Sequence, residues 1–163
     1  MARLMSMVLM AAVVLGASFS LARAGLQDGI DAYFDGDYAA ALENLKPEAE
    51  TDDVIAQYFL GEMYLQGKGV DQDFEQAVAW YERAAINGHP EAQAALGSLE
   101  MLGLGVPRHP TSGYFWLIVS VVWEDSDLRQ AAMSALGQAA VQLSPDQKRA
   151  MARAALPEWK RSQ

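Results

Sequence analysis

Apolar residues recur along the chain with the spacing of amphipathic helices, and the pattern repeats itself. Between residues 54 and 85, two helical stripes flank a glycine-containing turn. The same frame returns 36 residues later: Leu60-Gly61 returns as Leu96-Gly97, Gly67 as Gly103, Gly69-Val70 as Gly105-Val106, and Trp80 as Trp116. Matches in fixed order at one offset indicate an internal repeat made of helix pairs. Because no alternating segment of useful length predicts a strand, the chain is expected to be all-α.

The residues on both sides extend this helical pattern. Residues 25–50 hold two apolar stripes broken at Gly36 and are interpreted as a degenerate first unit, before units at about 54–88 and 90–124. Further helices are expected at about 126–160, which gives one repeat domain over residues 25–160. Tyr114 to Trp123 is almost unbroken in apolar residues and is expected to form the most buried helix.

Cap residues predict where helices begin. Asp71 or Asp73 is expected to cap the second helix of the middle unit, because a carboxylate there accepts free backbone N–H groups. Ser144-Pro145-Asp146-Gln147 predicts a capping box at the start of the last helix.

Residues 1–24 have the features of a cleavable export signal. Arg3 gives a positive start, residues 4–21 are uncharged and mostly apolar, and Ala22-Arg23-Ala24 places small residues at the two positions that a signal peptidase reads. An uncleaved anchor is the alternative, since an uncharged run of this length approaches a membrane span. Ser18 and Ser20 thin the apolar run and favour cleavage after Ala24. The mature protein is then expected to be periplasmic or secreted, without a membrane span.

Charge is unevenly distributed along the rest of the chain. Residues 25–163 carry 10 basic and 21 acidic side chains, and residues 25–75 alone account for the net charge of −11. Binding to nucleic acid is not expected, because its phosphates require a basic face. The acidic half is interpreted as a solvated face that favours solubility, with steering of a basic partner as the alternative. The chain has no cysteine, which excludes disulfides and thiolate chemistry.

Several patterns resemble metal or phosphate sites without completing them. Asp71, Asp73, Glu75 and Glu82 have the spacing of calcium-loop ligands, but Gln76 stands where that loop needs glycine. Residues 61–69 approach a phosphate loop but lack its Ser or Thr and a preceding strand.

The histidines and the first acidic cluster also have simpler interpretations. His89 and His109 each precede a proline, with no clear third metal ligand, and are interpreted as residues at helix starts. Asp28, Asp31 and Asp35 share a helix face and are interpreted as solvated. No metal, cofactor or catalytic site is therefore predicted.

One stretch matches a known family in detail. It carries Leu60-Gly61, Met63-Tyr64, Gly67-x-Gly69-Val70, Asp73, Ala77, Trp80-Tyr81, Ala84-Ala85 and Gly88, and it resembles the Sel1-like repeat, an α/α relative of the tetratricopeptide repeat. The next unit keeps the glycines and Trp116 but departs at His109, Gly113 and Ser120-Val121. The resemblance covers residues 54–123 clearly and residues 25–50 and 126–160 more weakly. It implies a short right-handed α/α solenoid of helical hairpins with a C-terminal capping helix.

The resemblance also implies a protein-interaction module rather than an enzyme. A cysteine-rich branch of the family is associated with β-lactam hydrolysis, but this chain lacks those cysteines. We therefore expect an adaptor or regulator that binds a protein or peptide in the bacterial envelope and needs no cofactor. The alternatives are a cell-wall- or β-lactam-directed hydrolase and a secreted host-interaction factor.

Possible partner-binding residues also come from the resemblance. In tetratricopeptide arrays the concave face is formed mainly by the first helix of each pair. The positions of those helices that we interpret as not used in packing include Gln57, Glu62, Gln93 and Glu100.

Overall fold

The computed structural model describes residues 25–121 and 126–155 of the chain. The predicted export signal at residues 1–24 lies outside the described residues, as do residues 122–125 and 156–163. The described chain begins with a helical segment at residues 25–35. The helices that follow are α2 (Tyr38–Glu50), α3 (Val54–Gln66), α4 (Phe74–Ile86), α5 (Pro90–Leu102), α6 (Pro110–Val121), α7 (Ser126–Ala140) and α8 (Pro145–Ala155).

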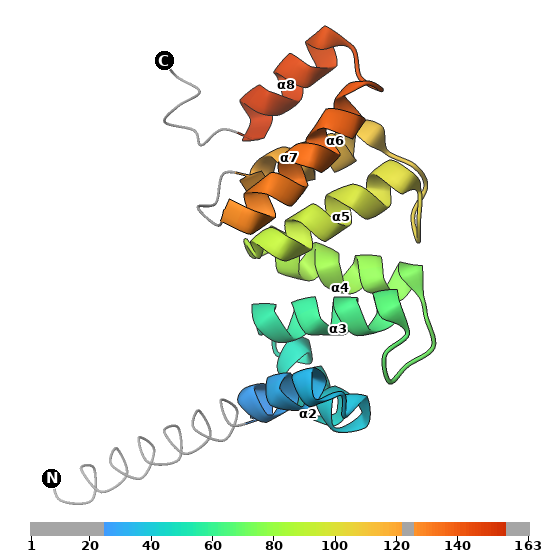
Figure 1. Ribbon diagram of the computed structural model, residues 1–163, viewed down its shortest axis with the longest axis vertical. Coiled ribbons are helices and arrows are strands. Elements are labelled where there is room, and N and C mark those ends of the chain that lie inside the picture. Colours follow the sequence, from blue (N-terminus) through green and yellow to red (C-terminus); the bar gives the residue numbers. More distant parts are fainter. Residues whose placement is uncertain (1–24, 122–125, 156–163) are drawn as a thin grey trace, which may run out of the picture.

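These helices stack one after another along the long axis of the molecule, from α2 at one end to α8 at the other (Figure 1). Each of α2 to α6 packs against the next helix in the chain, and α3 also touches α5 directly. At the far end α8 lies against α6. The described part of the chain is therefore the short α/α solenoid that the sequence predicts, with α8 covering the last hairpin.

Glycines inside the first helices let each hairpin close tightly. A Cβ atom on Gly61 of α3 would lie 2.6 Å from the ring of Tyr81 on α4. At the equivalent place in the next hairpin, a Cβ on Gly97 would lie 2.8 Å from the backbone oxygen of Gly113 and 2.9 Å from Cγ of Leu117. The two helices of each hairpin could not approach this closely with a larger residue at either position.

The two glycines of each turn have separate roles. Gly67 and Gly103 end α3 and α5 with φ of 67° and 75°, a left-handed conformation that other residues reach poorly. The second glycine of the turn meets the preceding hairpin instead: a Cβ on Gly105 would lie 2.2 Å from the backbone oxygen of Phe74 at the start of α4. The Gly-x-Gly pattern thus both ends a helix and brings consecutive hairpins together.

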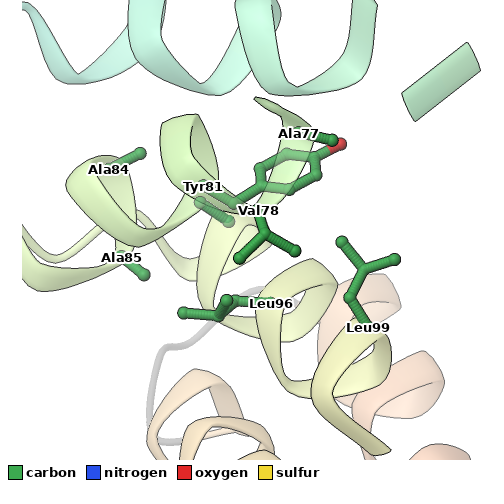
Figure 2. Packing of buried hydrophobic residues seen from close by; sticks show 8 residues of the cluster. Ala77, Val78, Tyr81, Ala84, Ala85, Leu96 and Leu99 are labelled. Carbon is green, nitrogen blue, oxygen red and sulfur yellow. The ribbon is translucent and has the colours of Figure 1, made fainter. Parts of the chain in front are cut away.

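The buried apolar residues form successive clusters along the stack. One buried cluster joins α2 and α3 through Leu45, Leu60 and Met63, together with Tyr33 of the first helical segment. A second joins α4 to α5, where Tyr81 and Val78 lie close to Leu96 and Leu99 (Figure 2). α3 takes part in both clusters, because its Tyr58 and Leu65 pack against the second one. Each hairpin is thus stabilised by apolar contact with its neighbour.

The predicted caps are present. The Asp73 carboxylate accepts hydrogen bonds from the backbone N–H groups of Glu75 and Gln76, at 2.9 and 3.0 Å. The Gln147 N–H donates to Ser144 Oγ at 3.2 Å, and the Ser144 N–H donates to Gln147 Oε1 at 2.9 Å. The second pair of bonds is the reciprocal arrangement of a capping box.

The expectation that Tyr114–Trp123 forms the most buried helix is wrong. Only Gly113, Leu117 and Ser120 are buried in α6, and Trp123 lies outside the described residues. The apolar side chains at 114–116, 118, 119 and 121 are half-buried. α6 packs against α5, α7 and α8, but its apolar run extends around every side of the helix, so only part of it can face these neighbours.

We predict that Gly61→Ala destabilises the protein, because the added methyl group meets the buried ring of Tyr81. The expected loss in the free energy of unfolding is about 1–3 kcal/mol, the usual effect of overpacking. Urea denaturation followed by circular dichroism measures it.

Gly137→Ala is the matched control, since a Cβ at this helical position of α7 meets nothing within 4 Å. It should stabilise by roughly 0.5–1 kcal/mol through helix propensity. If both substitutions stabilise to the same extent, close packing at Gly61 is not the constraint that we describe.

Candidate partner-binding face

One side of α3 and α5 is left uncovered by the packing of the stack. Its residues are exposed or half-buried, they fall on one side of each helix, and they occupy equivalent positions 36 residues apart. The pairs are Ile55/Glu91, Tyr58/Ala94, Phe59/Ala95, Glu62/Ser98 and Gln66/Leu102. We call these residues the open face.

The open face is apolar at both ends. Ile55 is 43% exposed and Leu102 is 67% exposed. The ring of Phe59 lies 5.8 Å from that of Phe34, which is 74% exposed on the first helical segment. Phe34 and Phe59 are therefore apolar side chains in contact at the surface, a feature typical of sites that bind another molecule.

A fixed carboxylate lies near the middle of the open face. Glu62 accepts a hydrogen bond of 2.5 Å from the Tyr81 hydroxyl and a second from the side-chain amide of Gln66. Burial raises the pKa of Tyr81 above its ordinary value, and the nearby Glu62 raises it further, so the hydroxyl stays a donor. These two bonds hold Glu62 in place, which prepares its charge for a basic or hydrogen-bonding partner.

A histidine supports the edge of the open face. The His89 ring stacks on Tyr58 with centroids 4.5 Å apart and planes 15° from parallel. Its Nδ1 lies 3.1 Å from Glu91 Oε2 but makes no aligned hydrogen bond. Burial lowers the pKa of His89, and the Glu91 carboxylate only partly opposes that effect. Burial thus favours the neutral form of the imidazole that stacks on Tyr58.

The interpretation of Gln57 and Gln93 as positions not used in packing is wrong. Both are buried, with 0% and 3% exposure. The Gln57 side-chain amide donates to the backbone oxygen of Ala49, and that of Gln93 donates to the backbone oxygen of Ala85 at 3.0 Å. Each glutamine thus ties a first helix to the end of the preceding second helix, and neither side chain can face a partner.

The two predicted glutamates lie at different repeat positions and are not brought together. Glu62 is on the open face, whereas Glu100 matches Tyr64 in the 36-residue frame and faces the start of α6. The pKa of Glu100 is raised above its ordinary value because the carboxyl group is partly buried. Hydrogen bonding from Ser112 and the charge of His109 oppose this effect only in part. Its Oε2 is buried and has no hydrogen-bond partner among the described residues. Glu62 remains a candidate contact, and Glu100 lies away from the open face.

Within residues 25–121 and 126–155, no group of three or more Asp, Glu or His side chains gathers as a metal site. The acids of the calcium-like spacing include Asp73, whose carboxylate caps α4. In the same part of the chain, no helix has both the length and the apolar character needed to cross a membrane.

Comparisons with known proteins agree with this geometry. The family model described as Sel1 repeat matches residues 54–89 and 90–118, which hold the α3–α4 hairpin and most of the α5–α6 hairpin. A crystal structure of a protective antigen present in uropathogenic Escherichia coli strains, displaying an SLR fold, is similar with a TM-score of 0.72 and 26% identity. The similarity covers 82% of this chain and 29% of that one, so this chain spans less than a third of that protein.

A second solved structure has a similar length. It is a Sel1 repeat protein from Oxalobacter formigenes, with a TM-score of 0.63 and 27% identity over 77% of this chain and 97% of that one. The stacking of consecutive hairpins is therefore shared over most of the length of this smaller protein.

Sequence reasoning missed most of the open face. It did not identify Tyr58, His89 or the pairs at 55/91 and 66/102 as one surface. The 36-residue frame held a usable signal, because Gln57 and Gln93 are identical at equivalent positions, whereas Glu62 and Ser98 differ. A polar residue retained in both copies of an internal repeat suggests a role in packing, and one that varies suggests a surface.

We predict that His89 makes the protein less stable as pH falls. Its pKa is lowered in the folded state, so between that value and the unfolded value of 6.5 the unfolded chain binds more protons. The contribution of His89 to the free energy of unfolding is therefore fully present above the unfolded pKa. It is lost as pH falls from the unfolded pKa through the folded pKa.

Urea unfolding at pH 7.5 and pH 5.5 measures the effect in the wild type and in His89→Gln. The loss of unfolding free energy between the two pH values should be smaller in the variant, which cannot take up the proton. Equal losses in both proteins would show that His89 titrates normally in the fold.

Proposed function

Because this chain is a Sel1 repeat protein, we propose that it is an adaptor or regulator that holds a protein or peptide partner on the open face. The fold is generally a non-catalytic protein-binding scaffold, and we assign the chain no catalytic step. The observation that carries the proposal is the series of exposed apolar side chains on successive first helices, beside a carboxylate already held in place.

The chemistry of the open face suggests the kind of partner. Ile55 and Phe59 offer apolar contact, and Glu62 and Glu91 offer negative charge next to it. A segment that presents apolar side chains together with Lys or Arg would complement this surface. The charge of the acidic half has the same sign and would speed the approach of such a segment at low salt.

The open face is built on rigid elements. Its side chains stand on two helices that both pack against α4, and the close contact at Gly61 fixes α3 against α4. Little conformational entropy is then lost by the protein on binding, so affinity depends mainly on the partner.

We place this activity in the bacterial envelope, either in the periplasm or after secretion. Support comes from residues 1–24, with their positive start, apolar run and Ala22-Arg23-Ala24 end. The mature chain would begin at Gly25.

The partner-binding prediction is tested by photo-crosslinking in envelope extract. Benzoylphenylalanine in place of Ile55 or Leu102 should give the same specific adduct, because both positions are exposed on the open face. Ile86 is the matched control, since it is 67% exposed but lies at the end of α4, which contributes no residue to the open face. An adduct of equal yield at Ile86, or none at Ile55 and Leu102, would contradict the proposal.

The export prediction is tested by intact mass spectrometry of the protein recovered from periplasmic and culture fractions. The expected mass corresponds to a chain that begins at Gly25. A recovered protein that retains Met1, or a chain found only in the cytoplasm, would overturn the location without affecting the binding face.

A further inference from the structure

A pocket lies beside the open face, among α5, α6 and α7. Its volume is about 200 Å³. The residues that line it include Ser98, Met101, Leu102, Arg108, Leu117 and Ala135. Ser98 and Leu102 belong to the open face as well, so a chain lying along that face would reach the pocket.

The described lining of the pocket combines apolar side chains with the charged group of Arg108. Met101 and Leu117 are buried, with 7% and 1% exposure, and they line it together with Leu102 and Ala135. Among the described residues of the lining, Arg108 is the only one that carries a charge, and none of them is Asp or Glu. Its complement is therefore an apolar group with a negative charge next to it.

The guanidinium group of Arg108 is held in place. Its Nε donates to the backbone oxygen of Met101 at 2.8 Å, and one terminal nitrogen donates to Gln142 Oε1. These bonds use two of its N–H groups, and a guanidinium has five. An Arg fixed in this way can donate to a carboxylate without first losing side-chain entropy.

We propose that this pocket binds the C-terminal residue of the peptide partner, with its apolar side chain among Met101, Leu102 and Leu117 and its carboxylate on Arg108. The proposal rests on the proposed function, since it assigns one end of the partner that the open face holds. A C-terminal residue satisfies both requirements at once, because it carries a side chain and a carboxylate on the same carbon.

The size of the pocket favours one residue over a whole small molecule. Sites for drug-sized ligands are usually about 300–1,000 Å³, which is larger than this pocket. The charges of the surface also set a direction for the peptide. Glu62 and Glu91 attract basic residues near α3 and the start of α5, while Arg108 attracts the terminal carboxylate near the end of α5.

The test uses N-acetyl-L-leucine as the probe and N-acetyl-L-leucinamide as its uncharged control. The complete chain is expressed with ¹³C-methyl methionine, purified and titrated with each compound by NMR. The Met101 methyl signal should shift and saturate with the acid, at an affinity about tenfold higher than with the amide. Met63, buried between α2 and α3, should not shift.

Two substitutions test the role of charge. Arg108→Gln should weaken binding of the acid about tenfold and leave binding of the amide unchanged. Leu102→Glu should also weaken binding of the acid, because the new carboxylate repels it. The position is 67% exposed, so the substitution should not destabilise the protein. Arg83→Gln is the matched control, because Arg83 pairs with Asp52 and is not part of the lining.

Three outcomes would overturn the proposal. They are equal binding of acid and amide, no Met101 shift with either compound, and a Met101 shift that follows protein concentration alone and so reveals a second copy of the chain in the pocket. Any of these outcomes, together with specific crosslinking at Ile55, would show that the pocket does not bind the C-terminal residue, while the proposed function would still hold. Selective binding of the acid without any crosslinked partner would support the pocket and count against the wider role.

Discussion

Close approach of backbone to neighbouring atoms at a few glycines determines how this molecule is built. Gly61 brings α3 onto the ring of Tyr81, and Gly97 brings α5 onto Gly113 and Leu117. Gly105 then places the turn of one hairpin against the start of the preceding second helix. Since these contacts recur with the 36-residue period, each hairpin meets the next in the same way. The stack and its surfaces follow from that repetition.

The same packing determines which side of α3 and α5 stays uncovered as the open face. Each first helix buries side chains against helices on either side, so only one narrow side remains for solvent or a partner. Residues beneath the open face fix the side chains on it. The Tyr81 hydroxyl donates a hydrogen bond to Glu62, and the His89 ring stacks on Tyr58. The buried interior therefore prepares the surface, and surface charge changes along the stack from Glu62 and Glu91 to Arg108.

The fold could be predicted from the sequence because its signals are local. Helix periodicity, the cap at Asp73 and the Ser144–Gln147 capping box depend on residues close together in the chain, and the repeat supplied the architecture. The candidate site could be predicted only in part, because exposure depends on neighbours distant in sequence. Gln57 and Gln93 are polar yet buried, since each finds a carbonyl group of the preceding helix. The pocket at Arg108 is lined by residues of three helices and of the turn before α6. A motif in one stretch of sequence cannot predict it.

The central claim is that the open face of α3 and α5 holds the partner. Hydroxyl-radical footprinting tests it directly, because it reports the solvent exposure of individual side chains with and without the crosslink-identified partner. We expect oxidation of Phe59 and Leu102 to fall in the complex, while that of the exposed Ile86 is unchanged. Protection of Ile86, with Phe59 and Leu102 still oxidised as in the free protein, would contradict it.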